Sequence, residues 1–199
     1  MITNSPAEPD SRPPSDDPLP GFRFEHTPRD GDQYARLKPG VLVPLVVEGP
    51  VTVETHPDTT FGVRLRFDTE ANTYLVEKLT ISDARGVSVS DLHSYSIPTL
   101  TKRAASAAVM IELDEVSGDK GKYDHFENVM SLIDLSGTRE AIRAAGPTDR
   151  TLWLVALIYA HAKAVGANPN STVTSTLAIP KRTATRWIAR ARELDLLDG

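Results

Sequence analysis

The segment from residue 148 to residue 197 alternates apolar runs with helix breakers in a way that few folds accommodate. Leu152 to Ala160 is an unbroken apolar run of nine residues, too short for a membrane span and suited to a buried helix. Gly166 can end that helix, and Ala178-Ile179-Pro180 makes a tight turn before a third periodic stretch. The spacing predicts helices over about residues 149–165, 172–178 and 181–196.

The middle stretch fits two structures on local grounds. Residues 172–179 alternate as in a strand and are poor in strong helix formers. Ser171 can cap a helix there, and Val173 and Leu177 have the i, i+4 spacing of one helix face. The helices expected on both sides favour a helix, whereas a strand would contradict a helix-turn-helix.

The third stretch separates into an apolar and a basic face when it is arranged at about 100° per residue. The apolar face holds Ala184, Trp187, Ile188, Ala191 and Leu194. Residues 181–192 contain five basic residues and no acidic one, although the whole chain has a formal net charge of −5. Charge is thus segregated along the chain, and this face suits the phosphates and base edges of DNA.

Recognition helices enter the major groove with their N-terminal residues. The residues expected to meet base edges are Lys181, Arg182, Thr185 and Arg186. The residues expected to meet phosphates are Arg190, Arg192 and Ser171. Trp187 is expected to anchor the core rather than to stack on a base.

Residues 177–194 resemble the helix-turn-helix found near the C-terminus of many small actinobacterial and actinophage proteins. The shared features are Pro180 after an apolar residue, a basic, threonine-containing helix start, the Trp187-Ile188 pair and an Ala-Arg-Glu-Leu stretch. Residues 148–165 resemble the helix that precedes the motif, and residues 91–102 are more faintly similar. The departure is the segment 172–176, which lacks the usual Ala, Glu or Lys. The resemblance implies DNA binding without fixing a biological role.

The N-terminal part of the chain has a different pattern from the helical C-terminal segment. Residues 1–35 are predicted to be a disordered, acidic, proline-rich tail, since six of the fifteen prolines lie in the first twenty residues. Alternating stretches between about residues 41 and 82 predict one small antiparallel sheet, in which Pro44 indicates an edge strand or a bulge. Ser96-Ile97-Pro98 is typical of a helix start.

These patterns predict an α+β protein, with a small antiparallel β-sheet plus helix N-terminally and an all-helical, trihelical helix-turn-helix C-terminally. The predicted divisions are a tail at 1–35, a small α+β domain at 36–115, a connecting segment at 116–147 and a DNA-binding domain at 148–199.

The chain lacks the residues or motifs that several classes of function require. The chain has no cysteine, and its five histidines show no zinc-binding spacing. No phosphate-binding glycine loop or nucleophile elbow occurs. We therefore assign no catalytic residue, metal or cofactor and expect a non-enzyme. Without a signal peptide or an apolar span, the expected location is the cytoplasm.

The sequence thus predicts sequence-specific binding to double-stranded DNA, in transcriptional regulation in an actinobacterium or its phage. A homodimer through the N-terminal domain is the expected assembly. The main alternative is an interaction or assembly protein, such as a phage packaging or structural component, that uses the helix-turn-helix for protein contacts. A less favoured alternative is an enzyme with its site in the N-terminal α+β part.

Overall fold

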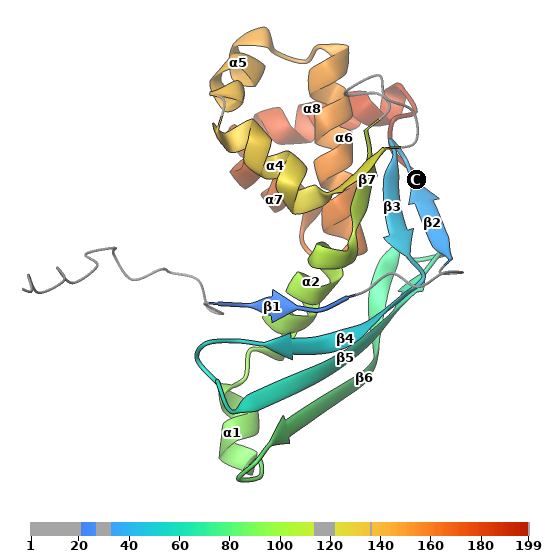
Figure 1. The fold of residues 1–199 in the computed structure, drawn as a ribbon. Helices are drawn as coiled ribbons and strands as arrows, with labels where there is room; N and C mark the ends of the chain where they lie inside the picture. The colour runs from blue at the N-terminus through green and yellow to red at the C-terminus, as the bar shows by residue number, and fades with distance from the viewer. Residues whose placement is uncertain (1–20, 27–32, 114–121, 136, 199) are drawn as a thin grey trace, which may run out of the picture.

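The computed structural model of the chain describes residues 21–26, 33–113, 122–135 and 137–198, and these form a mixed α+β protein (Figure 1). The strands are β1 (Arg23–Phe24), β2 (Tyr34–Leu37), β3 (Val41–Pro44), β4 (Val46–Thr52), β5 (Thr59–Asp68), β6 (Thr73–Asp83), β7 (Met110–Glu112) and β8 (Tyr123–His125). The helices are α1 (Val89–Ser94), α2 (Ile97–Ala108), α4 (Phe126–Leu135), α5 (Thr138–Ala145), α6 (Asp149–Ala164), α7 (Pro169–Leu177) and α8 (Lys181–Glu193).

The strands form two antiparallel sheets rather than the single sheet expected. The large sheet has the order β1-β4-β5-β6, and the small sheet has the order β2-β3-β7-β8. Pro44 was expected to mark an edge strand or a bulge, and this is wrong because β3 lies between β2 and β7. Pro44 is the last residue of β3 and lies beyond the part that pairs with β7. The chain passes there into β4 of the large sheet, so its missing N–H costs no ladder bond to β7.

The large sheet is covered on one face. Along β5 the side chains alternate, and Phe61, Val63, Leu65 and Phe67 are buried whereas Arg66 is exposed. Helix α2 packs on the buried side and contacts β4 and β5. The opposite face carries charged side chains in solvent, as is usual for an antiparallel sheet.

These elements correct the predicted bounds of the tail at 1–35 and the predicted role of the segment 116–147 as a connector. Residues 1–20 lie outside the described residues, but β1 and the start of β2 fall within 1–35, so the assigned tail is too long. The segment 116–147 is no mere connector, because it contains β8, α4 and α5. Strand β8 completes the small sheet by pairing with β7.

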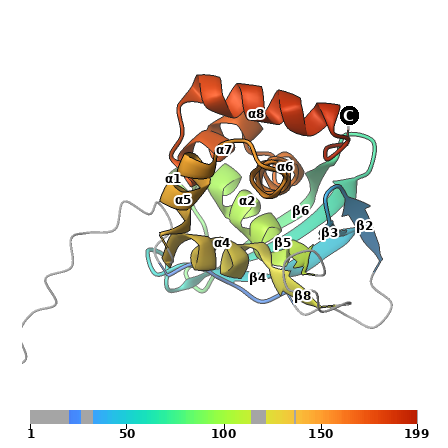
Figure 2. The same ribbon diagram turned by 90° about the horizontal axis from the view of Figure 1, so that it is seen from above.

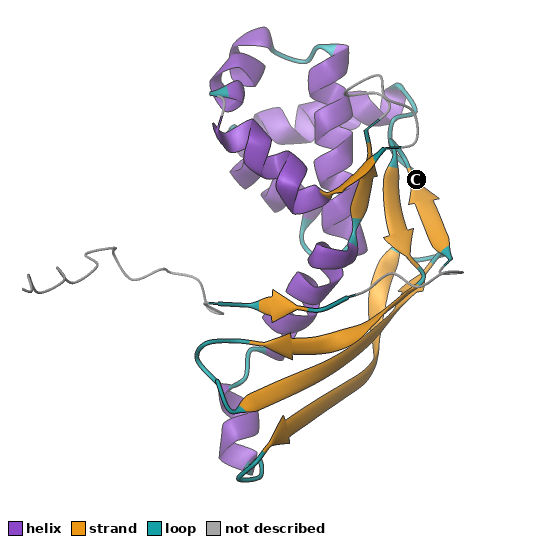
Figure 3. Cartoon of the chain, viewed as in Figure 1, coloured by secondary structure: helices purple, strands orange, loops and turns teal. Residues whose placement is uncertain are grey.

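One continuous apolar core joins the sheets to the helices. Helix α6 is its centre: it contacts α7, α8, β3 and β6, and most of its side chains are buried. Figure 2 shows α6 end-on between the strands and α8, so that α8 lies on the outside of the helical group. Strands and helices are otherwise segregated, with the helices α4 to α8 gathered at one end of the molecule (Figure 3).

Candidate nucleic-acid interface

Helices α6 and α7 each begin at a side-chain cap, whereas α8 follows Pro180 and has no side-chain cap. The Thr148 hydroxyl accepts from the Thr151 amide at 3.3 Å and caps α6. The Asn168 side chain accepts from the Ser171 amide at 3.0 Å and caps α7, with Pro169 in its first turn. The middle stretch is therefore a helix, but it begins at Pro169. The expectation that Ser171 caps it is wrong, because Asn168 provides an equally good acceptor three residues earlier.

The turn between α7 and α8 is short. Ala178 ends α7 in the left-handed conformation, with φ of 49°. Ile179 is buried, and Pro180 precedes the first turn of α8. The chain thus passes from α7 to α8 through three residues, and α8 packs against both α6 and α7.

The apolar face of α8 is buried nearly as expected. Ala184, Trp187, Ile188 and Ala191 are buried against the core. Leu194 is the exception: it lies at the end of the helix and is 39% exposed. Leu197 is buried in the segment that follows. Helical extrapolation fails at this point because α8 ends at Glu193 and the backbone turns.

The basic residues in the first half of α8 have no structural explanation. Lys181, Arg182 and Arg186 are exposed, and within the described parts of the chain none of their side chains has a hydrogen-bond or ion-pair partner. The first turn of α8 contains no acidic residue. A helix N-terminus carries partial positive charge, so Lys181 and Arg182 stand where a cation is unfavourable. These two charges therefore do not contribute to the stability of α8.

The arginines in the second half of α8 make contacts within the protein. Arg190 pairs with Glu193 at 2.8 Å. Arg192 donates to the Tyr159 hydroxyl at 2.8 Å and lies over its ring, 5.1 Å from the centroid. Both lie near the helix C-terminus, where a positive charge is favourable. These two arginines therefore serve the fold in the absence of any ligand.

Thr185 and Ser171 lie on the same part of the molecule but differ in availability. The Thr185 hydroxyl donates to the Lys181 carbonyl at 3.0 Å, so only its lone pairs remain for a ligand. Ser171 is exposed in the first turn of α7, and its amide is occupied by Asn168. Its hydroxyl is the group that could meet a phosphate.

A further arginine comes from a segment that the sequence did not indicate. Arg143 on α5 approaches the carbonyl oxygen of Ala178 at 3.5 Å, in the turn that precedes α8. Helix α5 also contacts α7. Arg143 also pairs with Glu140 at 3.8 Å, so α5 brings an arginine, but little net charge, near the start of α8. The position of Arg143 depends on how α5 packs, and no sequence motif near Arg143 indicates that packing.

The far end of α8 is tied to the small sheet. The Lys38 ammonium contacts Asp195 at 2.7 Å, and the Lys38 amide donates to the Asp198 carboxylate at 2.8 Å. Lys38 lies in the turn between β2 and β3. The basic face is therefore presented on a helix that is supported along its buried side and at its end.

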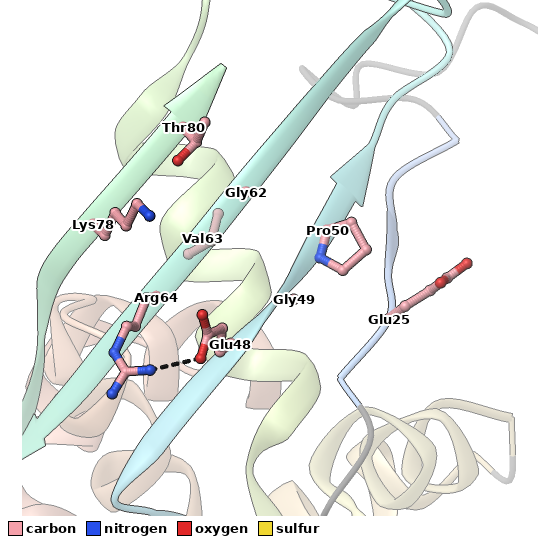
Figure 4. A pocket seen from close by; sticks show the side chains of 9 residues that line it. All are labelled: Glu25, Glu48, Gly49, Pro50, Gly62, Val63, Arg64, Lys78 and Thr80. Atoms are coloured by element: carbon pink, nitrogen blue, oxygen red, sulfur yellow. Dashed lines mark hydrogen bonds and ion pairs between the residues drawn. The ribbon is translucent and has the colours of Figure 1, made fainter. Parts of the chain in front are cut away.

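The open face of the large sheet has a hollow of about 480 Å³, shown in Figure 4. Its floor is low at Gly62, which carries no side chain and lies opposite Pro50 on this face. Its charged groups neutralise one another, as in the 2.6 Å contact between Arg64 and Glu48. The hollow therefore offers weaker recognition of a charged ligand than the first half of α8.

Comparisons with protein-family models, curated proteins and solved structures find no match to this chain. None of the helices in the described ranges combines the length and apolar character needed to cross a bilayer. The His, Asp and Glu side chains of residues 21–26, 33–113, 122–135 and 137–198 form no cluster of three or more suited to a metal ion.

Proposed function

We propose that α6, α7 and α8 form a helix-turn-helix that binds double-stranded DNA, with α8 as the recognition helix, and that the protein regulates transcription by this binding. The observation that carries the proposal is the exposed, unpartnered group of cations in the first half of α8. Their position matches the part of a recognition helix that enters the major groove.

The roles divide by the contacts that each residue already makes. Lys181, Arg182 and Arg186 are free to reach base edges, and an arginine there can pair bidentately with guanine. Arg190 and Arg192 are exposed but positioned by Glu193 and Tyr159, which suits contacts to the DNA backbone. Arg143 and Ser171 would contribute further backbone contacts at the start of α8 and of α7.

The test is fluorescence anisotropy of a labelled random duplex, titrated with the full chain at two salt concentrations. The wild-type protein should bind in the micromolar range and more weakly at the higher salt, because binding releases counterions from DNA. Arg182→Glu/Arg186→Glu should abolish binding. Because neither arginine side chain has a partner in the fold, and because an acidic residue is favourable near a helix N-terminus, the unfolding temperature of this variant should equal or slightly exceed that of the wild type.

A matched control is Arg23→Glu/Lys102→Glu, which changes the net charge equally at exposed positions of β1 and α2. It should retain binding within about twofold, because charge far from the interface is screened. Equal loss in both double variants would refute a specific interface. Absence of binding by a folded wild-type protein at low salt would overturn the proposal and leave the basic face as a protein-contact surface.

The division of roles has its own test once a preferred sequence has been selected. Arg182→Ala should weaken binding to that sequence by about ten- to a hundredfold and reduce discrimination against random DNA. Arg192→Ala should weaken binding to both DNAs alike and reduce the salt slope by about one. Identical behaviour of the two variants would contradict the assignment.

A further inference from the structure

Strand β6 has a free backbone edge. Among the described strands, its neighbour is β5 on one side and it has none on the other. It is eleven residues long. Leu75 and Val76 on this strand are 41% and 52% exposed. A long edge with exposed apolar side chains is a template for pairing with another strand.

A bulge in β6 changes which of its residues share a face. Arg64 lies opposite Lys78 and Leu65 lies opposite Val76, so Glu77 is the extra residue. Opposed residues of an antiparallel pair point to the same face. Since Leu65 is buried and Arg64 is on the open face, Val76 faces the core side and Lys78 faces the open side. Glu77 contacts Arg64 at 3.1 Å and so lies on the open side as well.

The same reasoning places the rest of the strand. Tyr74 lies opposite buried Phe67 and faces the core side, and Leu75 lies opposite exposed Arg66 and faces the open side. Leu79 and Ile81 lie opposite buried residues of β5, Val63 and Phe61, and face the core side. Thr80 lies opposite Gly62 and faces the open side, beside Lys78 in Figure 4.

We propose that β6 pairs antiparallel with β6 of a second copy of this chain, about a two-fold axis between Glu77 and Lys78. Each Glu77 then lies opposite Lys78 of the other copy. The flanking pairs are Val76 with Leu79, Leu75 with Thr80 and Tyr74 with Ile81.

Every one of these pairs joins side chains of the same face. In a regular strand, residues an odd number apart lie on opposite faces, so this register would be forbidden. The extra residue at Glu77 shifts the alternation by one and makes the register possible. Two copies of β6 are thus complementary in charge and in apolar character. Their pairing would join the two large sheets into one continuous sheet.

This inference concerns a surface remote in sequence from α8 and does not depend on DNA binding. Its first test is the mass of the full chain by sedimentation equilibrium between about 10 and 100 μM, the range in which a modest edge interface associates. The wild-type protein should be dimeric at the upper end. Lys78→Glu, which opposes two carboxylates twice in the dimer, should raise the dissociation constant about tenfold or more. Lys102→Glu is the matched control and should leave the mass unchanged.

Charge exchange tests the register. Glu77→Lys should also be monomeric, whereas an equimolar mixture of Glu77→Lys and Lys78→Glu should restore the dimer. Because Glu77→Lys removes contacts to Arg64 and Arg66, its circular dichroism is compared with that of the wild type.

Cysteine crosslinking provides a second readout that needs no charge change, since the chain has no cysteine of its own. Val76→Cys mixed with Leu79→Cys should form a disulfide on oxidation, and each variant alone should crosslink much less. A monomeric wild type at the highest concentration, or a dimer that neither Lys78→Glu nor the cysteine pair affects, would overturn the proposal.

Discussion

His161 should make the stability of this protein fall as the pH drops below neutral. The ring lies on α6, is 6% exposed and stacks on Phe126, with ring centroids 3.5 Å apart. Its Nε2 lies 3.1 Å from the Ser106 hydroxyl, which also donates to Glu127. Burial lowers the pKa of His161 from 6.5 to about 3.

Proton linkage gives the direction and the size of this change in the free energy of unfolding. A lowered pKa means that the unfolded chain binds a proton that the folded chain refuses between about pH 6.5 and pH 3. The free energy of unfolding is therefore fully retained above pH 6.5 and falls as the pH decreases through this window. A pH of about 5 lies about 1.5 units below the pKa of His161 in the unfolded chain. Protonation of the unfolded chain therefore lowers the free energy of unfolding by roughly 2 kcal/mol, at about 1.36 kcal/mol per unit.

Urea unfolding of the wild type and of His161→Gln at about pH 7.5 and pH 5 measures this contribution. Glutamine can still bond to Ser106 but does not titrate. The wild type should lose about 2 kcal/mol more than the variant between the two pH values, because other titrating groups act equally in both. His93→Gln, at an exposed position of α1, is the matched control and should retain the full loss. An equal loss in the wild type and His161→Gln would show that burial of His161 is not the cause.

Four further substitutions have defined outcomes. Trp187→Ala should lower the free energy of unfolding by about 3–5 kcal/mol in urea denaturation, because the side chain is only 8% exposed; a loss below about 1 kcal/mol would mean it is not a core anchor. Asn168→Ala should cost about 1 kcal/mol by removing the cap of α7, while Ser171→Ala stays within about 0.5 kcal/mol, and the reverse order would restore Ser171 as the cap. Gly49→Ala should place a methyl group 2.4 Å from the Glu25 carbonyl oxygen and displace β1, so trypsin should cut at Arg23 faster than in the wild type.

Local periodicity was enough to predict α6 and α8, whereas the stretch that forms α7 also fitted a strand on local grounds. The buried run in α6, the Pro180 turn and the two faces of α8 all depend on residues three or four apart, which contact one another in any helix. The basic character of the first half of α8 is likewise visible in the sequence. The structure adds which of these arginines have partners: the Arg182 side chain has none among the described residues, whereas Arg192 donates to Tyr159.

The two sheets could be decided only by the tertiary structure. Strands β7 and β8 have three residues each, too few for a pattern, and β7 joins the small sheet by pairing Ile111 with Val41, seventy residues earlier. The same holds for Arg143, which the packing of α5 carries to the turn before α8. A helix is stabilised by bonds within one segment, whereas a sheet or a surface patch needs partners that no local pattern specifies.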